Sequence, residues 1–190
     1  SEGTSYTAPF YSSVSKLLPS DPVYNEDGSY NQKLISLKQR NPVLAQDYNY
    51  QREYVTRAFN TLYAEYEFIK DLKLKSTLSY DYNISKGKIW RDSRTSDGEK
   101  DNGAMSKAYG EYNKLVWSSQ LSYKWNIKRD HHLDALLGYE IDSKYNDDLY
   151  GKVTNFLTPA KNDVANGQKL ESVDGSSKNT RMVSYISRLN

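Results

Sequence analysis

The stretch Leu72-Lys73-Leu74-Lys75-Ser76-Thr77-Leu78-Ser79-Tyr80-Asp81-Tyr82-Asn83 alternates between two kinds of side chain. Its even positions are leucine, tyrosine and one serine, and all of its odd positions are charged or polar. Successive side chains on a β-strand point to opposite faces, so the pattern predicts a strand with one apolar and one polar face. A soluble sheet with one buried face gives the same alternation, so the pattern leaves open which solvent meets the apolar face.

The same period of two extends to both sides of this stretch and predicts an all-β fold. We expect an antiparallel up-and-down meander of about five strands, an arc of a larger transmembrane β-barrel with long extracellular loops. Asp27-Gly28 predicts a turn, and residues 32–39 are compatible with a short helix. The predicted order is a long loop over 1–47, a hairpin over 48–83, a loop over 84–111, a hairpin over 112–143, a loop over 144–180 and a strand over 181–190.

The aromatic residues favour a membrane as the solvent of the apolar face. Aromatics lie at the short-turn end of the strands (Tyr66, Phe68, Tyr123, Trp125) and at the long-loop end (Tyr80, Tyr82, Tyr139, Trp117). Between them lie mainly aliphatic residues, such as Leu74, Leu78, Leu121 and Leu137. Two aromatic girdles around an aliphatic belt are typical of outer-membrane strands, and a soluble sandwich has no reason to sort its aromatics in this way.

The composition excludes several classes of protein. Lys and Arg number 26 against 24 Asp and Glu, and this balance points away from a nucleic-acid partner. The absence of Cys removes disulfides and thiol chemistry. The mean hydropathy of −0.86 excludes a helical membrane protein, but only every second residue of a barrel strand faces lipid, so a barrel remains compatible with it.

Four motifs carry a family resemblance. They are Pro22-Val23-Tyr24-Asn25-Glu26-Asp27-Gly28-Ser29-Tyr30 with Asn41-Pro42-Val43; Tyr63-Ala64-Glu65-Tyr66-Glu67-Phe68-Ile69-Lys70-Asp71-Leu72 running into Leu78-Ser79-Tyr80-Asp81; His132-Leu133-Asp134-Ala135-Leu136-Leu137-Gly138-Tyr139-Glu140; and Ser184-Tyr185-Ile186-Ser187-Arg188-Leu189-Asn190. In this order they resemble the SusC/RagA family of TonB-dependent outer-membrane transporters of Bacteroidetes.

The resemblance implies a nutrient-uptake transporter in the bacterial outer membrane, with a plugged barrel of about 22 strands. It also implies a SusD-like surface lipoprotein as partner, TonB contact through a plug region absent from this chain, oligosaccharide or peptide substrates, and no cofactor. We therefore expect a fragment whose ends are cuts in a longer polypeptide. Made alone, it would expose its strand edges and lipid face and self-associate.

The candidate binding residues lie in the two predicted long loops or, for Tyr112, at the first residue of the hairpin that follows; long loops are where a barrel places its binding groups. We expect substrate contacts from aromatic and basic side chains, with packing of the loops as the alternative reading. The candidates are Trp90, Arg91, Arg94, Tyr109, Tyr112, Tyr145, Tyr150 and Phe156.

The sequence gives less support to a metal site or a catalytic site. Asp92, Asp97 and Asp101 lie close in sequence, but their spacing does not match a calcium loop and aspartate is common in turns. Polar residues that face a wet lumen need no catalytic role, so we assign no catalytic residue and do not expect an enzyme. The alternative function is a soluble all-β carbohydrate-binding module, which requires the apolar face to be buried within this chain.

Overall fold

The computed structural model describes residues 18, 20–32, 41–127 and 131–190. Within them the chain forms the helix α2 (Pro42–Tyr48), the short 3-10 helix η1 (Val164–Asn166) and five strands: β1 (Tyr50–Ile69), β2 (Leu72–Arg91), β3 (Ala104–Ile127), β4 (His131–Phe156) and β5 (Gly167–Leu189). The expected helix over 32–39 and the short turn at 128–130 fall almost wholly outside the described residues.

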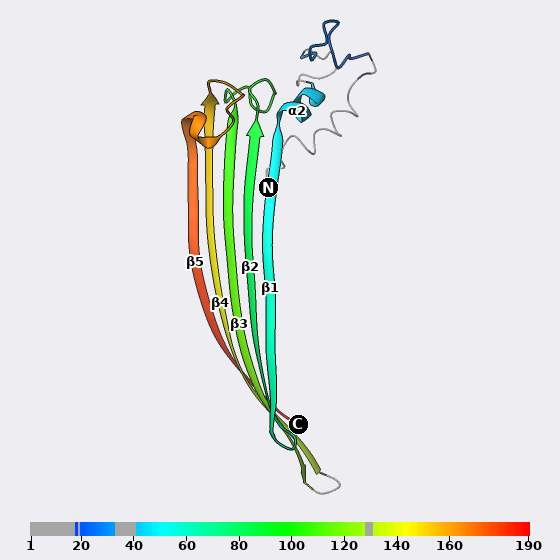
Figure 1. The fold of residues 1–190 in the computed structure, drawn as a ribbon, viewed down its shortest axis with the longest axis vertical. Helices are drawn as coiled ribbons and strands as arrows, with labels where there is room; N and C mark the ends of the chain where they lie inside the picture. Colours follow the sequence, from blue (N-terminus) through cyan, green and yellow to red (C-terminus); the bar gives the residue numbers. More distant parts are fainter. Residues whose placement is uncertain (1–17, 19, 33–40, 128–130) are drawn as a thin grey trace. The chain divides into compact units, whose positions relative to one another are not determined.

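The strands form one sheet in the order β1-β2-β3-β4-β5, so each strand pairs with its neighbours in sequence (Figure 1). The predicted all-β meander of five antiparallel strands is confirmed. β1 and β5 are its edges. Five strands are too few to close a transmembrane barrel, so the sheet is open.

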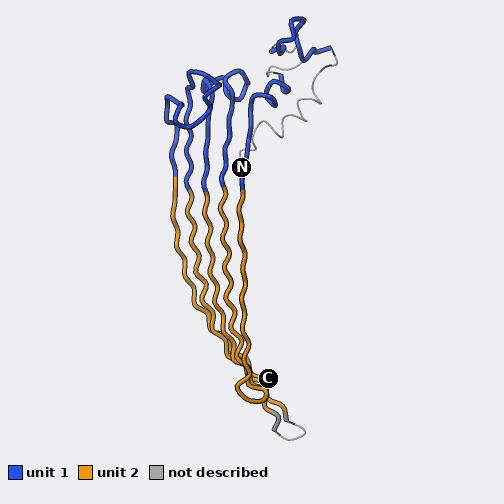
Figure 2. Tube along the Cα trace, viewed as in Figure 1, with its two compact units in different colours: residues 1–54, 86–109, 149–174 blue, residues 55–85, 110–148, 175–190 orange. Residues whose placement is uncertain are grey.

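The chain divides into two compact units (Figure 2). The first unit holds the described residues of 1–54, 86–109 and 149–174, and the second holds those of 55–85, 110–148 and 175–190. Every strand contributes residues to both units.

In the second unit, side-chain contacts fix the register of the strands. The Thr61 and Ser79 hydroxyls lie 3.1 Å apart across β1 and β2. The Ser76 and Ser119 hydroxyls lie 3.0 Å apart across β2 and β3. The ring of Tyr139 lies 6.1 Å from that of Trp117 and 5.3 Å from that of Tyr185. Because side chains alternate between the two faces, this register places five apolar residues in one row across the strands: Leu62, Leu78, Trp117, Tyr139 and Tyr185.

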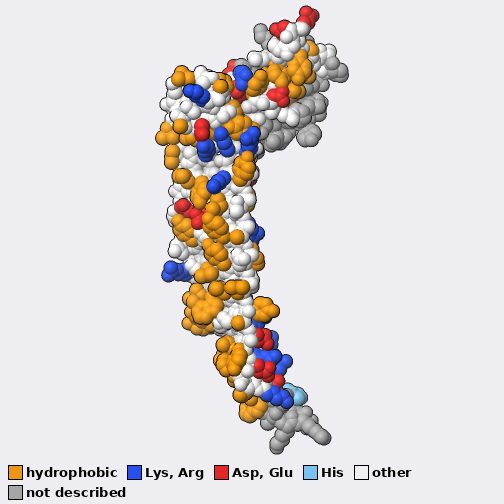
Figure 3. Space-filling view, viewed as in Figure 1, with side chains coloured by type: hydrophobic (Ala, Val, Ile, Leu, Met, Phe, Trp, Pro, Cys, Tyr) orange, Lys and Arg blue, Asp and Glu red, His pale blue; other side chains and the backbone are white. Residues whose placement is uncertain are grey.

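The apolar face of the second unit is exposed. Leu62 is 71% exposed, Leu137 61% and Leu78 42%. Figure 3 shows hydrophobic side chains gathered over the strands on the face that it presents. The opposite face carries ion pairs between neighbouring strands: Arg57 with Asp81 at 2.7 Å and Lys114 with Asp142 at 3.1 Å.

The connection between β1 and β2 is short, as predicted. Asp71 has a φ of 67°, a left-handed conformation that aspartate adopts more readily than most residues. Its N–H donates to a Glu67 carboxylate oxygen at 2.9 Å, and its carbonyl oxygen accepts the Lys124 N–H at 3.1 Å. The turn is therefore tied to both β1 and β3.

The strands extend far into the segments predicted as long loops. β2 continues to Arg91 and β3 begins at Ala104, which leaves residues 92–103 as the connection in place of 84–111. β4 reaches Phe156 and β5 begins at Gly167, which leaves 157–166 in place of 144–180. The strand thus continues where apolar alternation fades, because backbone pairing does not require an apolar face.

A small apolar core holds the first unit together. Trp90, Met105, Val153 and Phe156 are buried, and Tyr50 and Val164 pack against them. The rings of Trp90 and Phe156 meet edge to face with their centroids 4.8 Å apart, a favoured aromatic arrangement. This core joins β2, β3 and β4 at their loop ends to the segment that carries η1.

Loop 92–103 folds back on the end of β2. Its backbone N–H groups at Thr95 and Gly98 donate to the carbonyl oxygens of Asp92 and Thr95 at 3.0 and 3.2 Å. A Cβ atom on Gly98 would lie 2.3 Å from the Asp92 carbonyl oxygen and 2.7 Å from that of Arg91. Because both obstacles are backbone atoms, only glycine permits this approach.

We expect Gly98→Ala to open loop 92–103 and to destabilise the first unit by about 1–3 kcal/mol, the usual range for a strained backbone site. Chemical unfolding and proteolysis at the loop measure the effect. Gly151→Ala is the matched control, because a Cβ atom at Gly151 meets nothing within 4 Å. Equal stability of the two variants would contradict this account of the loop.

Candidate functional site

The helix α2 begins at a well-formed cap. The Asn41 side-chain oxygen accepts the Val43 N–H at 3.0 Å, and Pro42 occupies the first turn, where its missing N–H costs nothing. The Asn41 amide nitrogen donates to the Val23 carbonyl oxygen at 2.7 Å, and Leu44 is buried. This cap therefore fixes the helix against the segment 20–32, although the sequence prediction placed both in an irregular loop.

The segment 20–32 contains the predicted turn at Asp27-Gly28. Gly28 has a φ of 79°, and an Asp27 carboxylate oxygen accepts the Ser29 N–H at 2.9 Å. The bonds from the Ser29 side chain and backbone lower the pKa of Asp27. Tyr24 and Tyr30 form a β-bridge on either side of the turn, and the Tyr30 hydroxyl donates to Asp47 of α2, which raises the pKa of Tyr30.

Loop 92–103 contributes a charged pair to the same unit. The Arg94 guanidinium donates to both Asp92 carboxylate oxygens at 2.8 Å, a bidentate arrangement. Its central carbon lies 3.6 Å from the centroid of the Tyr48 ring, which makes a close cation–π contact. The Asp92 N–H donates at 2.8 Å to the side-chain oxygen of Asn49, the residue after α2. The loop is thus joined to the helix at two places.

Burial and hydrogen bonding shift the pKa of Asp92 in opposite directions. Burial raises the pKa of its carboxyl group, but the bonds from the Arg94 side chain and backbone outweigh burial, so the pKa is lowered. The same pairing raises the pKa of Arg94. Both groups stay ionised at neutral pH, and the cation lies over the Tyr48 ring.

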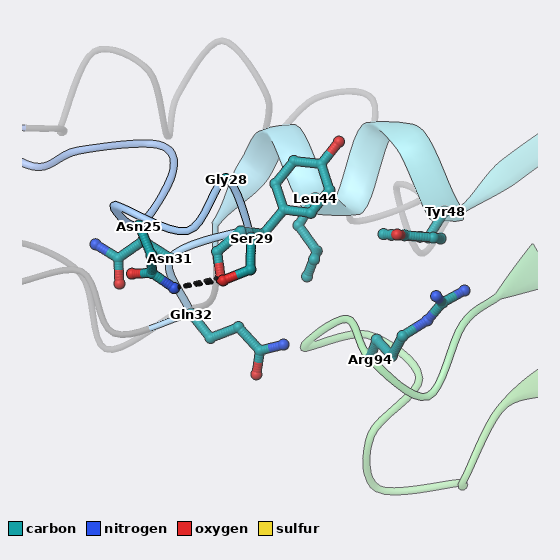
Figure 4. Close-up of a pocket in the computed structure, with 9 residues that line it drawn as sticks. Asn25, Gly28, Ser29, Asn31, Gln32, Leu44, Tyr48 and Arg94 are labelled. Carbon is teal, nitrogen blue, oxygen red and sulfur yellow. Dashed lines mark hydrogen bonds between the residues drawn. The ribbon is translucent and has the colours of Figure 1, made fainter.

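A pocket of about 620 Å³ lies between α2, the segment 20–32 and loop 92–103. Figure 4 shows Arg94 and Tyr48 on one side of it, and Asn25, Ser29 and Gln32 on the other. Its remaining lining residues are Gly28, Tyr30, Asn31 and Leu44. We call it the arginine pocket. An aromatic ring, a guanidinium and several amide groups suit it to a polar ligand with hydrogen-bonding groups or a negative charge.

A second hollow of about 540 Å³ lies on the strands of the first unit, and we call it the lysine hollow. It is lined by Tyr54, Lys86, Gly87, Lys88, Lys107, Ala108, Tyr109, Leu149, Tyr150, Gly151, Val164 and Val173. The Tyr150 hydroxyl lies 3.1 Å from that of Ser106. Two of the predicted binding residues, Tyr109 and Tyr150, therefore line this hollow.

The eight predicted binding residues do not form one site. Trp90 and Phe156 are 1% and 4% exposed and pack in the apolar core, so a ligand at the surface does not reach them. Arg94 lines the arginine pocket, and Arg91 ends β2 at the start of the loop.

Tyr112 and Tyr145 belong to the second unit and lie on opposite faces of its sheet. Tyr112 is two residues from Lys114 and shares its polar face, whereas Tyr145 is three residues from Asp142 and lies on the other face. Neither residue lines the arginine pocket or the lysine hollow.

The sequence analysis missed most of the arginine pocket. Asn41-Pro42 is an N-cap and first-turn signal that would have located α2 and therefore Tyr48. Among the described residues, no group of three or more His, Asp or Glu side chains is placed to hold a metal ion. The helices of the described residues also lack the length and apolar character needed to cross a membrane.

Protonation of Asp92 should release loop 92–103. Its folded-state pKa is depressed, so its contribution to stability is present above the unfolded value of about 3.9 and is lost as pH falls through the folded value. We expect hydrogen-exchange protection of the Thr95 and Gly98 amides, corrected for intrinsic rates, to fall between about pH 5 and pH 2. In Asp92→Asn, protection should be lower at pH 5 and insensitive to pH. A flat wild-type profile would refute this role of the ion pair.

Known proteins resemble this chain in sequence and in fold. No family model matches the chain. It is 26% identical over 136 residues to TonB-dependent receptor P26 of Formosa agariphila, an alignment that covers 67% of this chain and 13% of the receptor. Two structures of the RagAB peptide importer, in its closed-closed and open-open states, match 88% of this chain with TM-scores of 0.71 and 0.72 and identities of 17% and 16%.

The chain spans only 19% of the RagAB chain that it matches, and a similarly small part of the receptor. The structural likeness covers 88% of this chain and agrees with the resemblance carried by the four sequence motifs. The chain therefore has the fold of one segment of the RagAB peptide importer, and it is similar in sequence to part of a TonB-dependent receptor.

Proposed function

We propose that this chain forms part of the wall of an outer-membrane transporter that takes up oligosaccharides or peptides. The observation that carries the proposal is the exposed apolar face of the second unit, with ion pairs on the opposite face of the same strands. In water, a continuous leucine and tyrosine face of this kind is an aggregation hazard. Against lipid, with the polar face lining a wet lumen, each face has a suitable solvent.

Three polar side chains within the apolar face bond to one another, as a lipid environment favours. The Trp117 indole nitrogen donates to the Ser76 hydroxyl at 2.9 Å, and Ser76 lies within hydrogen-bond distance of Ser119 at 3.0 Å. An unpaired hydroxyl in hydrocarbon would be costly, and this small network removes that cost.

The polar face carries opposite charges on adjacent strands. Besides Arg57–Asp81 and Lys114–Asp142, Lys73 lies 3.5 Å from Glu65 and 3.8 Å from Glu67. Except for Asp142, which is buried, these side chains remain partly exposed, which fits a water-filled lumen. The pairs balance their charges, so this face supports a lumen wall, and we propose no catalytic role for it.

The alternative function, a soluble carbohydrate-binding module, is not favoured. It requires a second layer over Leu62, Leu78 and Leu137. The described residues provide no such layer, and these leucines remain 42–71% exposed.

The similar structures support the proposed substrate and partner. RagAB is a peptide importer, which supports a peptide substrate and a SusD-like lipoprotein partner for the transporter that contains this chain. Localisation in the outer membrane and contact with TonB through a plug region rest on the TonB-dependent receptor relative. The open edges of β1 and β5 fit pairing with further strands, and we expect the isolated chain to self-associate through them.

A charge on the proposed lipid face should hinder insertion. We expect Leu137→Arg to destabilise the inserted barrel by about 2–4 kcal/mol, the cost of an arginine near the bilayer midplane. Leu136→Arg is the matched control, because the adjacent leucine faces the polar side. Folding into lipid vesicles, followed by heat-dependent gel mobility and urea titration of the full-length transporter, measures the difference. A soluble module predicts that neither variant depends on lipid.

The arginine pocket is the proposed substrate contact in this chain. We expect Tyr48→Leu with Arg94→Lys to weaken ligand binding on the order of tenfold, because the cation–π contact and the bidentate bonds to Asp92 hold this wall of the pocket in place. Binding of a defined pool of oligopeptides and, separately, of neutral oligosaccharides to the full-length protein tests this and identifies the substrate class. Lys144→Gln, on β4 away from the pocket, serves as the control. Unchanged affinity for both pools would remove the pocket from the substrate path.

A further inference from the structure

The apolar side of the strands becomes cationic toward the loop ends. In β2 the positions that carry Leu74, Leu78 and Tyr82 continue at the same alternation to Lys86 and Lys88. In β3 the positions that carry Trp117 and Leu121 extend back to Tyr109 and Lys107. The three lysines therefore occupy the strand positions that face lipid under the proposed function, on which this inference rests.

The lysine hollow brings these side chains together within the first unit. Gly87 and Ala108 also line the hollow, between the lysines of β2 and β3. Its rim is apolar and exposed: Tyr54 is 64% exposed, Val173 62% and Leu149 56%. Figure 3 shows Lys and Arg side chains gathered near the loop ends of the strands on the face that it presents.

Only part of the positive charge is neutralised. Lys107 lies 2.6 Å from an Asp163 carboxylate oxygen, and this contact lowers the pKa of Asp163. The Lys88 ammonium lies 5.5 Å from the centroid of the Tyr50 ring. Lys86 is exposed, and no acidic side chain pairs with it in the described part of the chain. Lys88 also interacts electrostatically with Asp163, so this one carboxylate faces two lysines, and Lys86 stands beside them on the same strand.

We propose that the lysine hollow binds the phosphate-bearing head group of an outer-leaflet lipid. Two other ligands fit the hollow less well. Free phosphate would gain no binding energy from the apolar rim, and a transported substrate would contact the opposite, polar side of the strands. Lys86 follows the girdle residue Tyr82 by four positions on the same strand. Lysines next to apolar residues suit the head-group region of a leaflet, where basic side chains bind anionic lipids.

The test uses the full-length transporter in phosphatidylcholine nanodiscs titrated with lipid A, a phosphorylated glycolipid. We expect the triple variant K86Q/K88Q/K107Q to bind lipid A at least tenfold more weakly, since each basic side chain near an anionic lipid surface contributes about 1 kcal/mol. The matched control is K73Q/K75Q/K124Q, which removes three lysines from the polar face and should leave affinity unchanged. Lipid A without its phosphates should bind weakly to the wild type, and millimolar inorganic phosphate should not displace intact lipid A.

Two results would overturn the inference while leaving the proposed function intact. One is equal lipid A affinity of the triple variant and wild type, both inserted and heat-modifiable. The other is displacement of lipid A by inorganic phosphate, which would make the hollow a simple anion site. Failure of the wild-type protein to insert into any bilayer would instead refute the proposed function, and this inference with it.

Discussion

The pairing of backbone groups between neighbouring strands is the constraint on which the rest of this structure depends. Each strand bonds to its neighbours in sequence, and each residue is thereby assigned to one of two faces. The hydroxyl pairs Thr61–Ser79 and Ser76–Ser119 hold the register. A slip of one residue would exchange the leucines with the ion-paired lysines and aspartates, so the register decides which solvent each side chain meets.

The sequence was sufficient to predict the strand type, the strand order and the apolar face, because those features follow from alternation between Leu72 and Asn83 and its counterparts. It was insufficient to predict where the strands end. Beyond Ile84, Lys86 and Lys88 occupy the positions of the apolar face, and a pattern defined by apolar residues ends there although β2 continues to Arg91. Hydrogen bonding between backbones continues regardless of side-chain polarity, so alternation underestimates the length of such a strand.

The candidate site was harder to predict for a different reason. Aromatic residues in a polar segment suggest binding, yet Trp90 and Phe156 are the largest apolar side chains at the loop ends and form the core that holds those ends together. Arg94 was predicted as a binding residue from its position in a polar segment, but its position over Tyr48 depends on α2, a helix whose signal is the two residues Asn41-Pro42. Contacts between segments that are so distant in sequence produce no periodic pattern of residues, so periodicity cannot predict them.

Along β2 the side chains of one face change from leucine to lysine, and these two residue types require different solvents. If water met this face along the whole strand, the exposed leucines would have no reason to remain. If hydrocarbon met all of it, Lys86 and Lys88 would each carry a large desolvation cost. Both residue types are accommodated where the solvent itself changes from hydrocarbon to head group, and phosphate is the partner that lysine finds there. Under the proposed function, the pattern on this one strand marks the membrane boundary, which the mean hydropathy of the chain does not reveal.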